Sequence, residues 1–326
     1  MKKAVLLFGL IAVLFFSGCS EKKSDEKAQK QNAVVRIGAQ PYPLYAPLFA
    51  AKNLGYIDEE LAKVNASYTW TEFKAGPLVN EAVASGNADI GIMADMPAIL
   101  AKSSGQDIQI FSHIAYGEKA LALVVKNDSP ISEVGQIKGK KIAYVKGSYA
   151  QHLLALLLKN NSLSFSDITS VNLGAGDIPA ALENGDIDGA VVWEQYISLL
   201  VVPGKAKVIA DGSGIKKGNN VAYVVKSFGD KHPDVLAAFI KANQRGADYI
   251  NEHPKEAAEL IAKNFGIEPA LLEVVFKNFV YYAAFSDDDI AEITKVKNYI
   301  LAEKIIQNDV DISQFVTTKY IKQAGL

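Results

Sequence analysis

From Val34 onward, short runs of β-branched and apolar residues alternate with segments of helical periodicity. This alternation is typical of parallel strands joined by crossover helices, so it predicts the α/β fold class. Strands are expected at Val34–Ala39, Ser67–Phe73, Ala88–Met93, Ile108–Ile114, Leu121–Lys126, Lys141–Val145, Ser170–Leu173, Gly189–Val192, Lys207–Ala210 and Ala222–Val225. Helices are expected near Tyr45–Lys52, Leu78–Ser85, Ala98–Ser103, Tyr149–Lys159, Ile178–Asn184 and Glu194–Leu200.

The pattern changes after Phe228, where helical segments follow one another without an expected strand between them. These segments are Asp234–Glu252, Pro254–Asn264, Pro269–Tyr281 and Asp287–Ile306. We therefore expect a helical cover at the C-terminal end of the chain.

Two blocks of the alternating part share one order of elements. Residues 81–93 and 180–192 each read as a helix, a Gly- and Asp-containing turn and an apolar strand. Residues 120–126 and 221–226 read as strands that cross into and out of a middle region. This order predicts two α/β lobes with a ligand cleft between them. The predicted division places residues 33–126 and 221–326 in lobe 1 and residues 127–220 in lobe 2.

The N-terminus has the parts of an export signal. Lys2 and Lys3 precede an uncharged run of 13 residues from Ala4 to Phe16, within the roughly 7–15 of a signal and short of the ~20 of a membrane helix. The sequence Phe16-Ser-Gly-Cys19 resembles the bacterial lipoprotein signal, in which the cysteine is acylated and becomes the first mature residue. An ordinary secretory signal with a chance cysteine is the alternative.

Residues 1–18 are thus expected to be a lipoprotein signal peptide and residues 19–32 a flexible tether. The tether is charged and almost free of apolar residues, so it cannot form part of a core. No later apolar run approaches the length of a membrane span. We expect a protein of the cell envelope, anchored by lipid on Cys19 in the periplasm or on the outer face of the cell membrane, and otherwise soluble.

Composition narrows the class of protein. The chain has 326 residues, 49% hydrophobic and 21% charged, enough for two ordinary globular domains. Lys+Arg 34 against Asp+Glu 36 leaves a net charge of -2, which gives no reason to expect nucleic acid as a partner. The single cysteine excludes a disulfide framework, and no two of the four histidines have metal-site spacing. We expect no metal and no cofactor.

Motifs of catalysis are incomplete. Residues 211–214 do not complete the Gly-x-Ser-x-Gly motif of a nucleophile elbow. Residues 174–176 lack the third glycine of a dinucleotide-binding turn. Residues 135–141 have the wrong spacing for a phosphate loop. The only thiol, Cys19, is assigned to the lipid. We therefore predict no catalytic residues and no enzyme.

The remaining candidates for a functional site are turns at which a helix begins directly after a strand. The turns are Gly76–Pro77, Asp95–Met96, Gly147–Ser148 and Gly174–Asp177. Free backbone N–H groups and the positive dipole ends of several helices in one cleft would suit an oxyanion. Taken singly, each turn is better explained as a helix cap, because Asp95 and Asp177 are ordinary N-cap residues and Ser148-x-x-Gln151 is a capping box.

Aromatic residues near these turns are candidates for an apolar wall around a ligand's tail. Tyr42 follows the first strand, Tyr149 begins a helix, and Trp193 closes a strand. Packing in the core is the alternative for each of them. Glu194 could bind an amine or sit at a hinge, although an exposed carboxylate at a helix start is the preferred interpretation. The two arginines, Arg36 and Arg245, offer no evident clamp for an anion.

Several motifs in order resemble the solute-binding proteins of ABC importers for aliphatic sulfonates, taurine and nitrate. They are Phe73-Lys-Ala-Gly-Pro77, Gly86-Asn-Ala-Asp-Ile-Gly91, Ala94-Asp-Met-Pro97, Ile137-Lys-Gly-Lys-Lys-Ile142, Lys146-Gly-Ser148, Ala181-Leu-Glu-Asn-Gly-Asp-Ile-Asp188 and Val192-Trp-Glu-Gln-Tyr196. The resemblance implies a type II periplasmic-binding-protein fold, whose two lobes close over one small anionic organic solute. It implies delivery to an ABC permease with its ATPase, by a protein we expect to be monomeric.

The resemblance also implies that the turns at Gly76, Asp95–Met96 and Gly147–Ser148 hold the anionic head of the ligand, with Trp193 nearby. An alkanesulfonate or taurine is the expected ligand. Nitrate, bicarbonate, a thiamine-precursor pyrimidine and a flavin are alternatives within the same transport role. Enzymes on the same fold, a cysteine-dependent desulfinase and pyrimidine synthases, are the other class; the lack of a second cysteine and the export signal argue against them.

Overall fold

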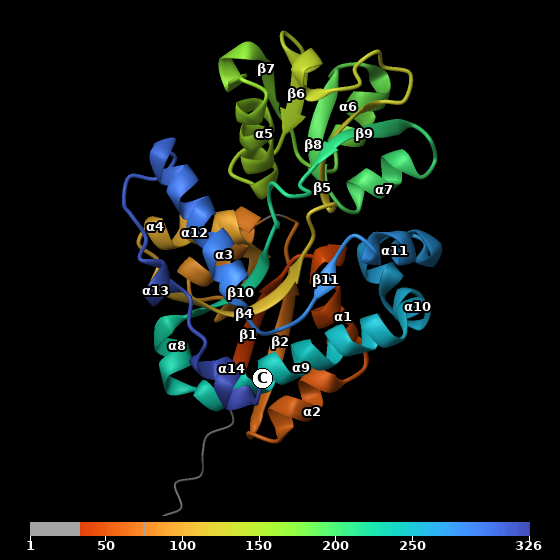
Figure 1. The fold of residues 1–326 in the computed structure, drawn as a ribbon. Helices are drawn as coiled ribbons and strands as arrows, with labels where there is room; N and C mark the ends of the chain where they lie inside the picture. The colour runs from red at the N-terminus through yellow and green to blue at the C-terminus, as the bar shows by residue number, and fades with distance from the viewer. Residues whose placement is uncertain (1–32, 75) are drawn as a thin grey trace, which may run out of the picture. The chain divides into compact units, whose positions relative to one another are not determined.

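The computed structural model describes residues 33–74 and 76–326. The predicted signal peptide, the tether and Cys19 lie outside the described residues. The described part forms two β-sheets with helices on their faces (Figure 1). Among the described residues, no helix is both long and apolar enough to cross a membrane.

The first sheet has six strands in the order β11-β4-β10-β3-β1-β2. Strand β1 pairs in parallel with both neighbours, whereas β10 runs antiparallel to β3 and β4. Its strands are β1 (Ala33–Ala39), β2 (Ala66–Glu72), β3 (Ile90–Ala94), β4 (Ile108–Tyr116), β10 (Asn220–Val225) and β11 (Val280–Tyr281).

The second sheet has five strands in the order β7-β6-β8-β5-β9. Strands β6, β7 and β8 are parallel, and β5 runs antiparallel to β8 and β9. Its strands are β5 (Leu121–Lys126), β6 (Lys141–Tyr144), β7 (Thr169–Asn172), β8 (Gly189–Trp193) and β9 (Ala206–Asp211).

The centre of each sheet is buried on two faces, which is why β3, β8 and most of β10 are apolar. In β10, Val221 and Tyr223 pack into one hydrophobic cluster, while Ala222 and Val224 pack into another. In β8, Val192 faces one cluster and Trp193 the opposite one. The two-residue period of a strand therefore decides that Trp193 lies on the face covered by α5 (Tyr149–Asn160).

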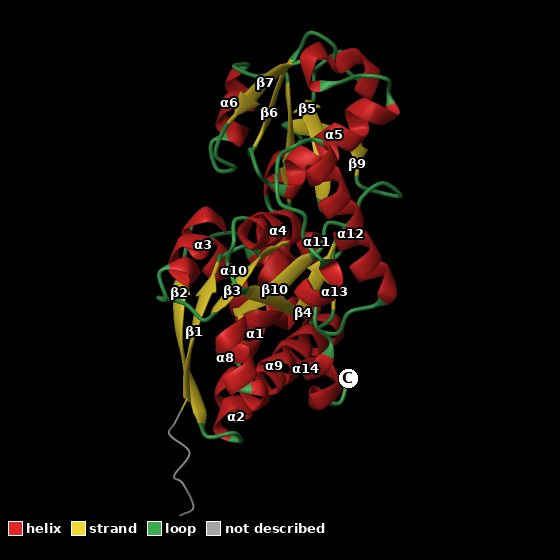
Figure 2. Ribbon diagram, turned by 90° about the vertical axis from the view of Figure 1, so that its left-hand side faces the viewer, coloured by secondary structure: helices red, strands yellow, loops and turns green. Residues whose placement is uncertain are grey.

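Helices cover each sheet from two sides (Figure 2). One face of the six-stranded sheet packs against α1 (Ala46–Asn53), α2 (Tyr56–Ala62), α9 (Pro233–Glu252), α10 (Pro254–Phe265) and α14 (Lys319–Ala324). The other face packs against α3 (Gly76–Ala84), α4 (Asp95–Ser103), α12 (Asp287–Ala302) and α13 (Ile312–Phe315). The five-stranded sheet lies between α5 on one face and α6 (Ile178–Asn184) and α7 (Tyr196–Val201) on the other. The remaining elements are η1 (Pro43–Tyr45), η2 (Val134–Ile137), η3 (Phe165–Asp167), α8 (Lys226–Lys231) and α11 (Pro269–Phe276).

The α/β class and all ten predicted strands are confirmed, with ends that differ by no more than a few residues. The C-terminal region departs from the prediction most clearly where a strand replaces the end of an expected helix. The helix expected at Pro269–Tyr281 ends at Phe276, and Val280–Tyr281 form β11 on the edge of β4. Apolar residues at the end of this segment fit a buried helix and a strand equally well, so the pattern alone could not separate them.

Strand β5 also differs from the prediction. We expected residues 120–126 to cross between lobes as part of lobe 1, but β5 pairs with β8 and β9 inside the five-stranded sheet. The segments that join the two sheets are residues 117–120 and 212–219. They are hydrogen-bonded to each other, since the N–H of Gly117 donates to the carbonyl of Lys217 (3.0 Å) and the N–H of Gly212 to that of Glu118 (2.9 Å). A Cβ at Gly212 would lie 2.6 Å from the Glu118 carbonyl oxygen, so this approach requires glycine.

Candidate ligand-binding site

The candidate site is built at the C-terminal ends of parallel strands from both sheets. Gln40 follows β1, and Asp95 follows β3 directly. Gly147 follows β6 closely, and Trp193 is the last residue of β8. Ligands of open α/β sheets bind outside the carboxyl ends of strands, where loops and helix starts converge. The order of elements along the chain therefore brings residues that are about 150 positions apart to one region.

Four aromatic rings form the aromatic group of this site: Tyr42, Tyr149, Trp193 and Tyr196. The Trp193 ring lies 5.7 Å from Tyr149, 6.1 Å from Tyr196 and 6.3 Å from Tyr42, measured between centroids. Tyr42 and Tyr196 are 6.4 Å apart at an interplanar angle of 62°. Tyr42 follows β1 of the six-stranded sheet and the other three belong to the five-stranded sheet and its helices, so the group joins residues of both sheets.

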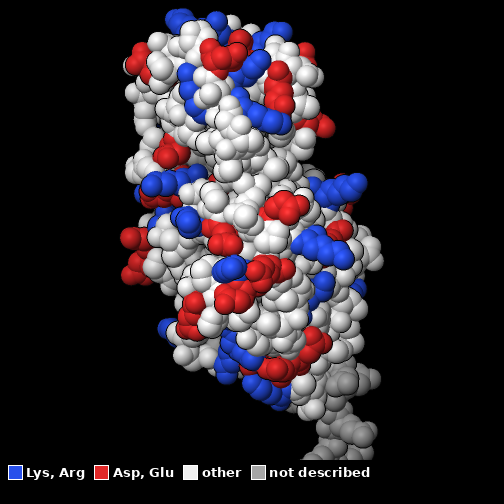
Figure 3. All heavy atoms as spheres, turned by 90° about the vertical axis from the view of Figure 1, so that its right-hand side faces the viewer, with Lys and Arg blue, Asp and Glu red and all other residues white. Residues whose placement is uncertain are grey.

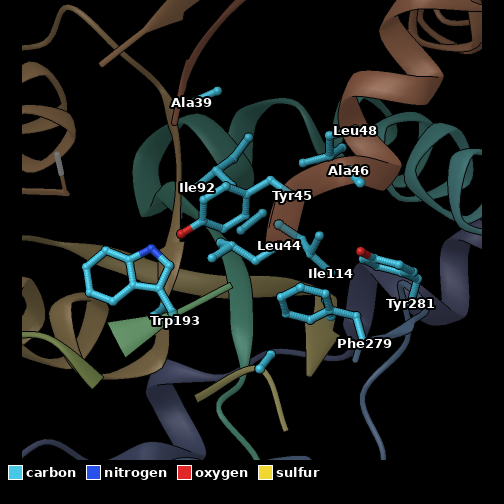
Figure 4. Close-up of a cluster of buried hydrophobic side chains, with 14 of the residues drawn as sticks. Ala39, Leu44, Tyr45, Ala46, Leu48, Ile92, Ile114, Trp193, Phe279 and Tyr281 are labelled. Atoms are coloured by element: carbon cyan, nitrogen blue, oxygen red, sulfur yellow. The ribbon is translucent and has the colours of Figure 1, made fainter. Parts of the chain in front are cut away.

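Trp193 continues from the aromatic group into the main hydrophobic cluster. Figure 4 shows its indole at one side of the cluster that includes Tyr45, with the Tyr45 hydroxyl pointing toward it. Trp193 is therefore packed in the core, and its contact with a ligand stays a prediction.

Two polar atoms of the aromatic group have no hydrogen-bond partner. The hydroxyl of Tyr149 and the Nε1–H of Trp193 are both buried and unpaired, in residues that are 4% and 9% exposed. A buried donor without an acceptor costs free energy, because it has given up its hydrogen bonds to water. A ligand atom that accepts hydrogen bonds would therefore be stabilised beside these two donors.

A buried ion pair lies beside the aromatic group. The Nζ of Lys216 is 3.5 Å from Oδ2 of Asp95, and neither side chain is exposed. Burial raises the pKa of Asp95, an effect that the positive charge of Lys216 opposes. Nothing in the sequence distinguished Lys216 from the other lysines, since its burial depends on the loop between β9 and β10. The site thus contains a cation that the sequence did not suggest.

Asp95 is not the N-cap of α4, contrary to expectation. The N-cap is Ala94, and Asp95 is the first helical residue. Its Oδ1 accepts a hydrogen bond from the N–H of Met96 at 2.7 Å. This carboxylate occupies a backbone donor that we expected to hold the head of an anionic ligand. The N–H of Met96 is therefore not free for a ligand. Met96 contributes to this region by the packing of its side chain, which is 0% exposed.

The turn at Gly147 and Ser148 opens α5, with Ser148 at the N-cap as expected. Gly147 has φ +77°, a conformation that favours glycine. The predicted capping box is absent: the Ser148 hydroxyl donates to the carbonyl of Val145 (2.7 Å), and Gln151 Oε1 accepts from the N–H of Gly147 (2.8 Å). The first N–H of the turn is therefore held by the side-chain amide of Gln151, which a ligand would have to displace.

The turn at Gly76 and Pro77 begins α3, as predicted. The Tyr42 hydroxyl donates to the carbonyl of Lys74 at 3.0 Å, which ties the aromatic group to this turn. Gln40, which sequence analysis missed, donates through Nε2 to the Ile92 carbonyl at 3.1 Å, and a Cβ at Gly76 would lie 4.0 Å from the same nitrogen. An amide directly after a buried strand was the signal that could have identified Gln40.

Glu194 is not an exposed carboxylate, so the preferred interpretation of it was wrong. It is 0% exposed, because it closes β8 beneath α7 and faces the turn after α11. It accepts from the N–H and hydroxyl of Ser198 (3.0 and 2.9 Å) and from Asn278 Nδ2 (2.6 Å). Burial raises its pKa, and these hydrogen bonds oppose the rise. These hydrogen bonds hold Glu194 in place, and Glu194 directly follows Trp193 of the aromatic group.

His152 is buried one helical turn after Tyr149, and its ring stacks on Tyr299 of α12 at 4.2 Å. Burial lowers its pKa to about 2, and the charge of Lys216 adds to this effect, so the imidazole is neutral. Arg36 is bonded to Asp89 at the far end of β1 and β3, which agrees with the expectation that it does not reach the site. The described residues contain no cluster of His, Cys, Asp and Glu that could hold a metal ion.

Residues 43–257 match the family model described as NMT1/THI5 like, which covers more than half of the chain. The chain belongs to the NMT1/THI5-like family. Over 329 residues it is 30% identical to the "Putative aliphatic sulfonates-binding protein" of Bacillus subtilis (strain 168), with 99% of this chain and 97% of that protein covered. The taurine-binding periplasmic protein of Escherichia coli (strain K12) is 33% identical over 57% of this chain and 58% of its own.

Solved structures support the fold of this NMT1/THI5-like chain. The alkanesulfonate-binding protein SsuA from Xanthomonas axonopodis pv. citri, bound to MOPS, superposes with a TM-score of 0.79 at 24% identity, over 88% of this chain and 98% of that one. The fold is therefore that of periplasmic binding proteins, as expected. More distant relatives include enzymes, such as the 4-amino-5-hydroxymethyl-2-methylpyrimidine phosphate synthase of Legionella pneumophila, 24% identical over 86% of this chain and 89% of its own.

Proposed function

We propose that this protein is the solute-binding component of an ABC importer and that it captures an aliphatic sulfonate. Two relatives that match 99% and 80% of the chain carry the names of aliphatic sulfonate-binding proteins, and the NMT1/THI5-like family supplies the fold for such a role. The protein makes and breaks no bond. Two lobes close over the solute, and the permease with its ATPase takes the solute from the closed form.

The observation that carries this proposal is the pair of buried donors on Tyr149 and Trp193. Both lack a partner, and the ammonium of Lys216 is paired with the Asp95 carboxylate at 3.5 Å. A sulfonate head has three oxygens that accept hydrogen bonds and no donor, so it satisfies donors of this kind without leaving an unpaired group. The rings of Tyr42 and Tyr196 then cover its carbon tail.

The location of the protein is part of the same proposal. Lipid on Cys19 holds the chain at the cell envelope, and the charged residues 20–32 let the folded part reach the permease. On the face shown in Figure 3, lysines and acidic residues are interspersed, which fits a partner other than nucleic acid. The protein acts as a monomer, one solute per chain.

A thermal-shift screen of the purified chain in non-ionic detergent tests the ligand. A solute that binds only the native state raises the melting temperature. Sulfonates and taurine are compared with nitrate, bicarbonate, a thiamine-precursor pyrimidine and a flavin. A shift with sulfonates alone is the expected result. A shift with a pyrimidine or flavin instead would keep the transport role and overturn the sulfonate, and turnover of any of these compounds would favour an enzyme.

A further inference from the structure

His152 lies at a contact between two helices that cover different sheets (Figure 1). It belongs to α5 on the five-stranded sheet, and its ring stacks on Tyr299 of α12 on the six-stranded sheet, at 4.2 Å between centroids and 18° between planes. His152 is 2% exposed and lies one helical turn after Tyr149 of the aromatic group. A motion that separates the two sheets therefore ends this stack and returns the imidazole to water.

The geometry of this contact suits a neutral imidazole. The Nδ1 of His152 is buried and has no hydrogen-bond partner, so a proton bound there would meet no acceptor. A buried charge without hydrogen bonds is costly, because it has lost its contact with water. The face of the Tyr299 ring attracts cations, but it does not replace those hydrogen bonds. The contact between α5 and α12 therefore opposes protonation of His152.

The charges that border the contact oppose protonation as well. The charge that acts on His152 is the ammonium of Lys216, from the segment that joins the two sheets, and it lowers the pKa of the imidazole beyond the effect of burial. The carboxylate of Asp95, at the start of α4, is paired with that ammonium at 3.5 Å and not with His152. No carboxylate in the described part of the chain forms an ion pair with this imidazole that could hold its proton.

The other titratable groups of this region are three tyrosines and one carboxylate: Tyr149 on α5, Tyr299 on α12, Tyr144 on β6 and Glu303 directly after α12. Tyr149 and Tyr299 stay neutral, because burial raises the pKa of both phenols. Glu303 is exposed, so water screens its charge. None of these groups offsets the burial of His152.

We infer that closure over the solute expels a proton from His152, so that the protein holds its ligand less tightly in acid. In the open form the imidazole is in water and titrates near its ordinary pKa of about 6.5. In the closed form it stays neutral. A ligand that selects the closed form must therefore remove a proton at low pH, and its affinity falls as the pH falls. This inference rests on the proposed closure of two lobes.

Isothermal titration of the unaltered chain in non-ionic detergent tests the inference. The ligands are butanesulfonate and taurine, which keep their charge between pH 5.5 and 7.5, and the buffers contain no sulfonate that would compete. We expect the dissociation constant of a ligand that binds to be about tenfold higher at pH 5.5 than at pH 7.5. At pH 6 the binding should release about 0.8 proton per ligand, read from the heats in bis-Tris and in succinate.

The outcomes separate the inference from the function on which it rests. Binding at pH 7.5 that neither weakens in acid nor releases a proton would overturn the inference and leave the sulfonate function intact. If neither sulfonate binds at pH 7.5, the proposed function fails and the inference fails with it.

A variant assigns the proton to its residue. His152→Phe keeps a ring against Tyr299 and removes the titrating group, so its dissociation constant should change less than about twofold between pH 7.5 and 5.5. The control is His253→Phe, which replaces an exposed histidine that lies 5.2 Å from the Tyr249 ring and should keep the full pH dependence. A pH dependence that persists in His152→Phe would assign the proton to another group, such as His113, and overturn the inference.

Discussion

The Nζ of Lys216 lies 3.5 Å from Oδ2 of Asp95, with both side chains fully buried. Lys216 belongs to the segment that leads back from the five-stranded to the six-stranded sheet, and Asp95 is the first residue of α4. The pair therefore fixes one crossing segment to the start of a helix that borders the candidate site. A buried ion pair of this kind fixes how the two segments are arranged more than it adds to the free energy of unfolding.

Breaking this pair from one side should be costly. Lys216→Met leaves Asp95 buried without a counter-charge, and we expect the free energy of unfolding in urea to fall by about 3–5 kcal/mol near pH 7. Without the lysine the folded pKa of Asp95 lies further above its unfolded value, so the deficit grows as the pH rises above about 4. The double variant Lys216→Met with Asp95→Leu should recover most of the stability.

The control for this prediction is Lys295→Met. Lys295 lies 3.4 Å from Glu292 but its side chain is 74% exposed, so its removal should change the free energy of unfolding by no more than about 0.5 kcal/mol. Equal effects of the two lysine variants would mean that Lys216 is solvated in solution.

Trp193→Phe tests the unpaired donor. The substitution keeps an aromatic ring and removes the Nε1–H, so sulfonate affinity should fall tenfold or more, corresponding to about 1.5–3 kcal/mol for a hydrogen bond to a charged acceptor. The free energy of unfolding should change little, because that donor has no partner in the protein. Trp70→Phe is the control, since the Trp70 Nε1–H donates to Glu72 at 3.0 Å on a different surface. Unchanged sulfonate affinity in Trp193→Phe would remove Trp193 from the site.

Gly147→Ala separates backbone strain from ligand binding. At φ +77° the alanine costs about 1 kcal/mol of stability, and its Cβ meets Leu100 at an ordinary 3.7 Å. Gly139→Ala, at φ +74° with nothing near its Cβ, should cost a similar amount. Only the Gly147 variant should also weaken sulfonate binding, because the added methyl narrows the approach to the start of α5. Equal affinities in both variants would contradict a role for this turn.

Acid stability should depend on Asp289. Burial raises the pKa of this carboxyl, but His113, Lys217 and Ser286 outweigh it and bring the pKa from 3.8 to about 2. A depressed folded pKa stabilises the native state fully above about pH 4, and that contribution is lost as the pH falls toward 2. Asp289→Asn should therefore lose about 2 kcal/mol at pH 7 and show a flatter stability curve between pH 4 and 2.

The control for the predicted loss of stability in acid is Asp288→Asn, which replaces an exposed carboxylate in the same helical turn. Its effect on the free energy of unfolding should stay below about 1 kcal/mol. Urea unfolding at several pH values measures both variants. Parallel curves for the Asp289 variant and the unaltered chain would contradict the predicted role of this carboxyl.

The lipid anchor has a direct test. When the chain is expressed in bacteria with a radiolabelled fatty acid, label should enter the protein, and Cys19→Ser should abolish both labelling and recovery in the membrane fraction. Labelling that persists in the variant would assign the lipid elsewhere. Release of the unaltered protein without label would favour an ordinary secretory signal.

The sequence by itself determined the local elements and their order. The periodicity of apolar residues located each strand expected between Val34 and Val225, because the two-residue alternation and the glycine-bounded turns are local properties. The same turns pointed to Gly76, Gly147 and Trp193, which do lie at the carboxyl ends of strands.

Only the tertiary structure decided which groups are buried together. Lys216 and Gln40 are unremarkable in the sequence, and Glu194 reads as a solvated helix start, yet all three are buried. Asp95 and Gln151 looked like caps or open turns, whereas their side chains hold the backbone donors expected for the ligand. Burial and partner choice depend on contacts between segments far apart in the chain, such as the crossing loop against α4. No local pattern contains those contacts, so the sequence could locate the turns of the site but not its charge.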